Sequence, residues 1–216
     1  MKKIVPILLL CFIGCKQQDK GKPVVVVSPS KMKVLYLGVN NPVSIVASGI
    51  PSYKIKVRVD DSLGSVKGDS GKYEVAVRTK LPTLKITVNK IDDNNKEEFL
   101  DTLIFKVRPV PSPIVSIAGQ TGECTLSREE IVQAGGIVPK INNFVFDMRF
   151  PVISYNLSAN INGLWIDSRG NGPAFTEEMK KLISKLESAG RILIEDVWIQ
   201  APEGKRKIPG MVIKIK

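Results

Sequence analysis

The feature that most constrains the fold is a series of short segments, between residues 23 and 108, in which apolar and polar residues alternate. Examples are residues 55–59 (IKVRV) and 73–77 (YEVAV). Successive side chains of a β-strand point to opposite faces, so strict alternation is typical of a strand with one buried face. Turn-forming stretches, such as residues 92–95 (DDNN), separate the segments. Six to eight short strands with no helix between them predict an immunoglobulin-like β-sandwich over residues 23–108.

Prolines mark the end of this region. In residues 108–113 (RPVPSP) every second residue is proline. Proline has no backbone N–H to donate to a β-ladder, and closely spaced prolines keep a chain extended. Residues 109–113 are therefore predicted to be a linker between the sandwich and a second domain.

Residues 114–216 have a mixed pattern, which predicts an α+β domain. Ser127 and Glu130 have the spacing of a capping box, and the short helix that follows is expected to end at residues 135–136 (GG). Thr176 is predicted to cap a second helix, which Gly190 ends. Its apolar face consists of Met179, Leu182, Ile183 and Leu186. Strands are predicted at residues 144–157, 191–200 and 211–215.

The N-terminus has the layout of an export signal. Lys2 and Lys3 precede an apolar run, residues 4–13, which is too short to span a bilayer, and polar residues follow Cys15 at once. The small Gly14 before this cysteine fits a lipoprotein signal. We therefore expect removal of residues 1–14, acylation of Cys15, a polar tether over residues 15–22 and firm attachment to a membrane. The alternative is an ordinary secretory signal that is cut nearby and leaves a free thiol.

The composition excludes several kinds of catalytic site. The chain has no histidine, and Cys124 is its third and last cysteine. Ser-His-Asp and Cys-His triads and zinc sites are therefore excluded. Ser28 and Lys31 match the S-x-x-K pattern of serine acyl-transferases, but Pro29 indicates extended structure and no partner motif follows. Residues 92–95 lack the spacing of a calcium loop and are predicted to be a hairpin tip. We expect no enzymatic activity, no cofactor and no metal.

The positive charge does not predict nucleic-acid binding. The net charge is +11, but acidic residues are interleaved along the chain. The one tight basic cluster consists of Lys205, Arg206 and Lys207, in a predicted turn. It is a candidate contact for an acidic partner. The alternative is a turn that only improves solubility. Trp165 and Trp198 stand apart in the sequence and are predicted to pack in the core or to contact a partner.

Three blocks of sequence resemble a known family. They are residues 26–45 (VVSPSKMKVLYLGVNNPVSI), 135–155 (GGIVPKINNFVFDMRFPVISY) and 175–216, which begins FTEEMKKLISKLESAGRILIEDVW. In this order they resemble the last two periplasmic domains of the GldM and PorM proteins of Bacteroidota, which serve in gliding motility and type IX secretion. The resemblance implies a GldM third-domain-like sandwich at residues 23–108 and a GldM C-terminal-domain-like unit at residues 114–216. It carries over no catalytic residue.

The family begins with a membrane-spanning helix that joins an energy-converting complex, and this chain has a lipoprotein signal in that place. The energy-converting role is therefore not carried over. The distal domains of the family reach an outer-membrane-associated lipoprotein ring. We accordingly expect a non-enzymatic, lipid-anchored protein of the outer membrane that binds envelope proteins, including secretion and gliding components. The alternative is a lipid-anchored adhesin or carbohydrate-binding module. Whether the chain forms a homodimer, and which face of the membrane it occupies, are left open.

Overall fold

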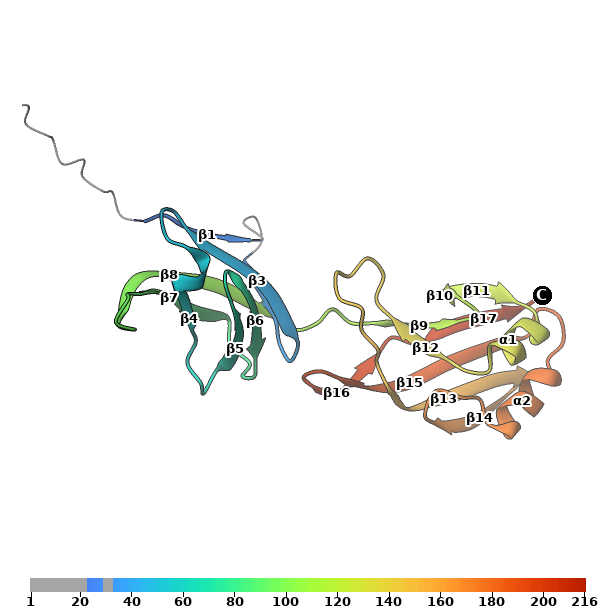
Figure 1. Ribbon diagram of the computed structural model, residues 1–216. Helices are drawn as coiled ribbons and strands as arrows, with labels where there is room; N and C mark the ends of the chain where they lie inside the picture. The colour runs from blue at the N-terminus through green and yellow to red at the C-terminus, as the bar shows by residue number, and fades with distance from the viewer. Residues whose placement is uncertain (1–22, 29–32) are drawn as a thin grey trace, which may run out of the picture.

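A computed structural model describes residues 23–28 and 33–216, which form two units joined near residue 110 (Figure 1). Residues 1–22 and 29–32 lie outside the described residues. The predicted signal, the tether, Cys15 and Lys31 therefore fall outside this description.

The N-terminal unit is a β-sandwich of two four-stranded sheets. One sheet has the order β1-β3-β6-β5 and the other the order β2-β8-β7-β4. The strands are β1 (Val25–Ser28), β2 (Val34–Tyr36), β3 (Asn40–Ala47), β4 (Ile55–Arg58), β5 (Gly64–Asp69), β6 (Lys72–Val77), β7 (Thr83–Ile91) and β8 (Glu97–Arg108), with a short 3-10 helix, η1 (Ser52–Lys54).

The alternation in the sequence places one row of side chains from each sheet in the core of the sandwich. Ile55 and Val57 of β4 are buried, while Lys56 and Arg58 between them are exposed. Buried residues such as Val75 meet those of the opposite sheet in one cluster. The predicted sandwich is confirmed.

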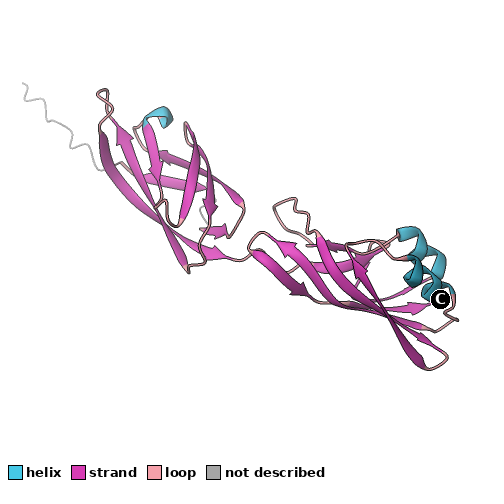
Figure 2. Ribbon diagram, turned by 90° about the horizontal axis from the view of Figure 1, so that it is seen from below, coloured by secondary structure: helices cyan, strands magenta, loops and turns pink. Residues whose placement is uncertain are grey.

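The C-terminal unit combines two sheets with two helices. The large sheet has the order β11-β17-β15-β13-β14, with β16 paired to the second half of β15, and the small sheet has the order β10-β9-β12. The elements are β9 (Ile114–Ile117), β10 (Gln120–Thr121), β11 (Glu123–Leu126), α1 (Arg128–Ala134), β12 (Val138–Lys140), β13 (Val152–Ile161), β14 (Leu164–Asn171), α2 (Glu177–Ser184), β15 (Arg191–Ala201), β16 (Gly204–Ile208) and β17 (Met211–Ile215). Figure 2 shows both helices together at one end of this unit. The predicted α+β class is confirmed.

The helix caps are as predicted. The Ser127 side chain accepts a hydrogen bond from the Glu130 backbone N–H, and the Glu130 carboxylate accepts one from the Ser127 backbone N–H. Gly135 ends α1 in the left-handed conformation, at φ 71°. Thr176 caps α2. The four predicted apolar residues that begin with Met179 are buried in the core.

Two predicted boundaries are wrong. The second helix ends at Ser184, well before Gly190. The backbone N–H groups of the next two residues donate hydrogen bonds to carbonyl oxygens three residues earlier, where an α-helix would use those four residues earlier. The predicted strand at residues 144–157 begins only at Val152. The preceding residues form a loop. In this loop the ring of Phe144 packs against the ring of Tyr36 in the sandwich, so Phe144 contributes to tertiary packing and does not belong to a strand.

This contact belongs to a joint between the two units. The ring of Tyr36, at the end of β2, lies 5.0 Å from that of Phe144 and 5.8 Å from that of Phe146, measured between centroids, and both contacts are edge-on. In the predicted linker, Val110 is fully buried and belongs to the C-terminal core. Residues 109–113 have no regular secondary structure, as predicted, but the burial of Val110 attaches them to the C-terminal core.

Candidate interaction surface

The large sheet of the C-terminal unit has one covered face and one open face. Its covered face carries residues such as Leu157 and Ile213, which are fully buried among α1, α2 and the small sheet. Residues that alternate with them point the other way, where the described part of the chain provides no covering layer. We call this the outer sheet face. Its members include Asn156, Asn160, Trp165, Asp167, Arg169, Arg191, Asp196, Trp198, Gln200, Lys205, Lys207 and Lys214.

Both tryptophans lie on the outer sheet face. Trp198 is opposite Ser154 of β13 and Trp165 is opposite Asn160 of the same strand. Their exposed fractions are 41% and 48%, so neither serves in the core. Their cross-strand partners, Ser154 and Asn160, are six residue steps apart along β13, which corresponds to about 20 Å along the strand. Of the two predictions made for them, core packing is wrong, and contact with a partner stays a prediction.

A β-bulge turns an acidic side chain toward the same face. Between Ser154 and Asn156, two steps along β13 correspond to three steps along β15. The extra residue is Asp196, which has a φ of 48°. Its carboxylate accepts a hydrogen bond from Lys207 Nζ at 2.5 Å and lies 3.4 Å from Asn156 Nδ2. A row of paired polar groups therefore lies beside Trp198.

The predicted basic cluster is divided between the two faces of the sheet. Lys205, Arg206 and Lys207 lie in β16, and not in a turn. Lys207 is opposite Trp198 and Lys205 opposite Gln200, so both point to the outer sheet face. Arg206, which lies between them, points to the covered face, because successive side chains of a strand point to opposite faces.

Arg206 is therefore no part of an exposed cationic cluster, and its prediction as a partner contact is corrected. Its side chain is only 21% exposed and forms an ion pair of 3.0 Å with Glu203. Its Nη1 donates a hydrogen bond of 2.9 Å to the carbonyl oxygen of Val110. Arg206 thus holds the linker against the C-terminal unit. Lys205 and Lys207 remain candidate contacts.

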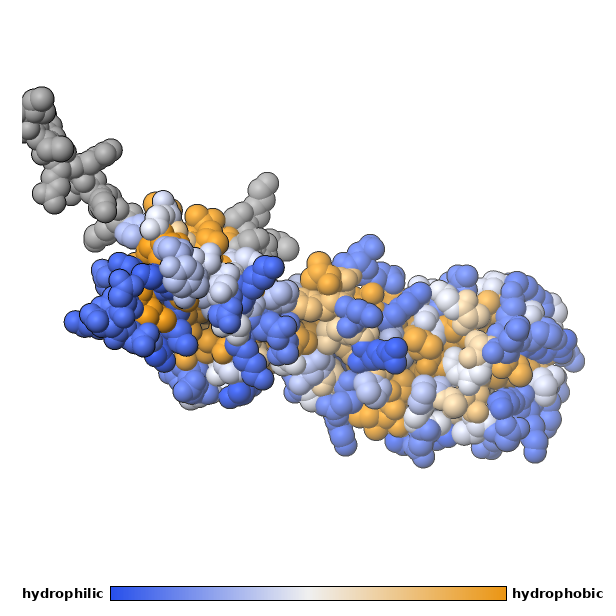
Figure 3. All heavy atoms as spheres, viewed as in Figure 1, coloured by the Kyte–Doolittle hydropathy of each residue, from blue (hydrophilic) through white to orange (hydrophobic). Residues whose placement is uncertain are grey.

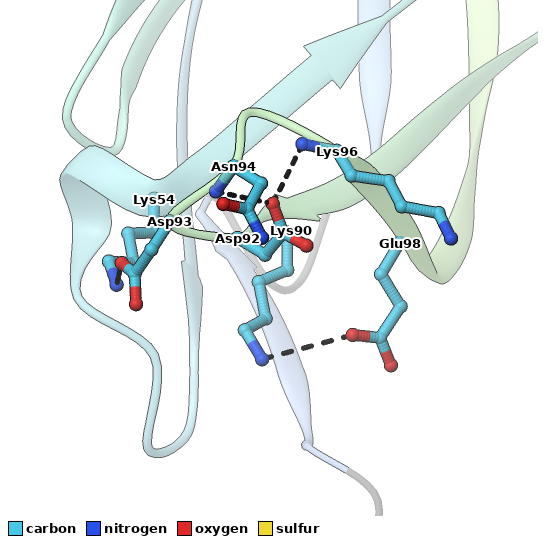
Figure 4. Close-up of polar contacts among 7 residues, drawn as sticks. All are labelled: Lys54, Lys90, Asp92, Asp93, Asn94, Lys96 and Glu98. Atoms are coloured by element: carbon cyan, nitrogen blue, oxygen red, sulfur yellow. Dashed lines mark hydrogen bonds and ion pairs between the residues drawn. The ribbon is translucent and has the colours of Figure 1, made fainter.

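The hairpin tip predicted at residues 92–95 is confirmed, and its carboxylates have partners within the sandwich (Figure 4). Asp92 Oδ1 accepts hydrogen bonds from the backbone N–H groups of Asn94 and Lys96, at 2.9 and 2.8 Å. Lys54 Nζ lies 2.6 Å from Asp93 Oδ1, and this hydrogen bond lowers the pKa of Asp93. Among the described residues no group of three or more metal-ligating side chains gathers.

Two reactive residues of the sequence, Ser28 and Cys124, lie on strands of different units. Ser28 lies in the strand β1, as its context predicted, and not at the start of a helix. Cys124 is half-buried in β11, and burial raises the pKa of its thiol. On the side of the molecule seen in Figure 3, hydrophilic residues are spread over both units, with apolar patches between them.

Comparison with known proteins supplies a family. Residues 24–108 match the family described as the GldM third domain, and residues 109–216 match the family described as the GldM C-terminal domain. The comparison with curated proteins found no match.

Two solved structures show a weak overall similarity to the chain. The fibronectin(III)-like modules of Clostridium thermocellum CbhA have 12% identity and a TM-score of 0.30, with 89% of this chain and 94% of that chain covered. The D00-D0 domain of Intimin has 12% identity and a TM-score of 0.29, with 88% and 99% covered.

Proposed function

The chain belongs to the GldM family through its third and C-terminal domains, and we propose that it is a non-enzymatic interaction module of the cell envelope. It is held on the outer membrane by lipid on Cys15 and binds envelope proteins of the gliding or type IX secretion machinery. The sequence around Cys15, with its basic start, apolar run and preceding glycine, supports the anchor. In the described residues no helix is long and apolar enough to cross a membrane.

The observation that carries the interaction role is the outer sheet face. Trp198 is 41% exposed there, beside the paired charges of Asp196 and Lys207. Large aromatic side chains are enriched at the centres of protein interfaces, while charged groups around them steer the approach of a partner. Because Lys205 and Lys207 point to the same face, the partner surface that fits best here is a protein with an apolar pocket and an acidic rim.

The test is cross-linking of the tagged full chain in its own cells, followed by identification of the captured proteins. For Trp198→Ala we expect capture of a gliding or secretion protein to fall about tenfold or more, since truncating a central aromatic costs on the order of 1–4 kcal/mol. Phe99→Ala is the matched control, because Phe99 is 63% exposed but lies on β8 of the sandwich. Equal capture by Trp198→Ala and the control would contradict the proposal.

The anchor has a test of its own. Cys15→Ala should abolish incorporation of labelled palmitate and release the protein from the membrane fraction. Protease treatment of intact cells then shows whether the anchored wild-type chain faces the periplasm or the exterior. A wild type that takes up no palmitate, together with a variant that stays with the membranes, would contradict the lipid anchor.

A carbohydrate-binding role is the second candidate, because Trp165 and Trp198 share one sheet face. A contiguous aromatic platform would favour this role, but the two tryptophans lie on different strands and their cross-strand partners are about 20 Å apart along β13. Binding of a purified envelope polysaccharide that is lost in both Trp165→Ala and Trp198→Ala, without capture of any protein, would favour it over the protein partner.

A further inference from the structure

The sheet β2-β8-β7-β4 of the sandwich has one side in the core and one solvent side, which carries cations. Ile55 and Val57 of β4, Leu84 and Ile86 of β7, and Phe105 of β8 are buried. The residues that alternate with them point to solvent. We call the cations among these the cationic sheet face: Lys56, Arg58, Lys85, Lys106 and Arg108.

The cations of this face occupy neighbouring positions on adjacent strands. Lys106 of β8 is opposite Thr83 of β7, and Lys85 lies two residues further along β7, opposite Ile104. Lys85 and Lys106 are therefore diagonal neighbours, with about 7–8 Å between their positions in the sheet. Like charges at this spacing repel one another, and a negatively charged surface laid over them removes the repulsion.

Most of these charges are not neutralised within the described part of the chain. Arg58 pairs with Glu97, and the other four cations of the face form no ion pair among the described residues. The solvent side of the other sheet of the sandwich differs, because there Lys67 lies opposite Glu74. The positive charge of the cationic sheet face is thus available to a partner.

An apolar side chain among the cations indicates which partner. Ile104 is 52% exposed and lies opposite Lys85. At the surface of an anionic bilayer, cations meet the headgroups and apolar side chains enter the boundary between headgroups and acyl chains. A soluble polyanion such as a nucleic acid or an acidic polysaccharide would meet the charges but would provide no apolar layer for Ile104.

The N-terminal residues limit how far the sandwich can be from such a surface. Cys15 is eight residues before Pro23, and a chain of this length spans at most about 28 Å. We infer that the cationic sheet face binds the anionic lipid headgroups of the membrane that carries the chain. The choice of this membrane depends on the proposed lipid on Cys15, whereas the affinity for anionic lipid does not.

Vesicle flotation tests the affinity with residues 23–216, which contain both folded units and no lipid anchor. We expect binding to vesicles of phosphatidylcholine mixed equally with phosphatidylglycerol, at least tenfold weaker binding to pure phosphatidylcholine, and loss of binding as salt is added. Each cation near an anionic bilayer contributes about fivefold to binding. Lys85→Ser combined with Lys106→Ser should therefore weaken binding to the mixed vesicles at least tenfold.

Lys67→Ser combined with Lys72→Ser is the matched control, because it removes two exposed lysines from the other sheet of the sandwich. Both double variants have the same net charge, so a general effect of charge would weaken them equally. The control should bind within about twofold of the wild type, and the thermal unfolding midpoint of each variant checks that folding is intact.

The inference is overturned if the wild type does not bind the mixed vesicles, if it binds pure phosphatidylcholine equally well, or if the two double variants bind alike. Capture of an acidic protein by this face, without vesicle binding, also overturns it. Because residues 23–216 lack Cys15, these outcomes are independent of the palmitate test of the anchor, and each proposal can fail by itself.

Discussion

Arg206 shows that a residue within a basic run of the sequence need not lie on a charged surface. Within a run of three cations, it is the one that the pleat turns inward, and its guanidinium donates to the carbonyl oxygen of Val110 in the linker. Its Nε and Nη2 atoms are buried and have no hydrogen-bond partner among the described residues, which reduces its net contribution to stability. The alternation of a strand that starts at Gly204 could have predicted this, but the proline and glycine before the cluster indicated a turn.

We predict that Arg206→Ala lowers the free energy of unfolding by about 1–3 kcal/mol, because the buried Val110 carbonyl then loses its donor. Lys205→Ala should change it by less than about 0.5 kcal/mol, since exposed charges contribute little. Denaturant unfolding of the two variants and the wild type measures both values. Equal losses in the two variants would contradict the assigned role of Arg206.

Glu97 predicts a pH dependence. Its carboxylate accepts hydrogen bonds from Arg58 Nε at 2.7 Å and from Asn89 Nδ2 at 2.8 Å, and so connects β8 to β4 and β7. The hydrogen bond from Arg58 is the main cause that lowers the pKa of Glu97 from 4.5 to about 2.

Because the folded pKa is the lower one, the unfolded chain takes up a proton first as the pH falls. The stabilisation is therefore complete above pH 4.5 and is lost as the pH falls through about 2. Glu97→Gln should be less stable than the wild type at pH 7, and the difference should vanish near pH 2. Urea unfolding between pH 2 and 7 measures it, and a difference that is constant over this range would refute the linkage.

At the scale of elements, the cap of α1 is a local feature with a distant contact. The Glu130 carboxylate completes the capping box and also pairs with Lys216 Nζ at 2.9 Å, which ties the helix start to the end of the chain. Ser127→Ala should lower the free energy of unfolding by about 0.5–2 kcal/mol. Ser127→Asp retains an acceptor at the cap and should lose much less. Denaturant unfolding compares the two variants, and equal losses would show that the cap is not the cause.

Elements were predictable from the sequence where their signals are local. Caps, turn residues and alternation lie within a few residues of the structure they specify, which is why they predict α1, α2 and the sandwich strands other than β5. Phe144 could not be placed, because its partner Tyr36 is distant in the sequence. The strand β14 was overlooked, although Asn162 and Gly163, at φ 52° and 83°, form a two-residue turn typical of hairpins. The outer sheet face depends on which strands are neighbours, and no local pattern gives that.

At the scale of the whole molecule, the closely spaced prolines of the linker favour a hinge-like, protease-sensitive joint between units that fold alone. The structure places several contacts across this joint. Tyr36 and Val39 of the sandwich pack against the C-terminal core, and the ring of Phe144 is 5.0 Å from that of Tyr36. Gly38 approaches Pro202 so closely that an added Cβ would lie 2.9 Å from it. These contacts hold the two units in one orientation, although each has a core of its own.

We therefore predict slow proteolysis within residues 109–113 of the wild type and fast cleavage there in Tyr36→Ala. Each aromatic pair contributes about 0.5–1.5 kcal/mol, so loss of the two that involve Tyr36 should raise the population of open joints roughly tenfold. Tyr53→Ala is the control, because Tyr53 is 69% exposed and lies in η1, away from the joint. The two products of this cleavage should each remain folded, since the cores of the two units are separate clusters. Equal cleavage of Tyr36→Ala and the control would mean that the aromatic contacts do not close the joint, and the orientation of the two units would then depend on the other contacts across it, those of Val39, Gly38 and Val110.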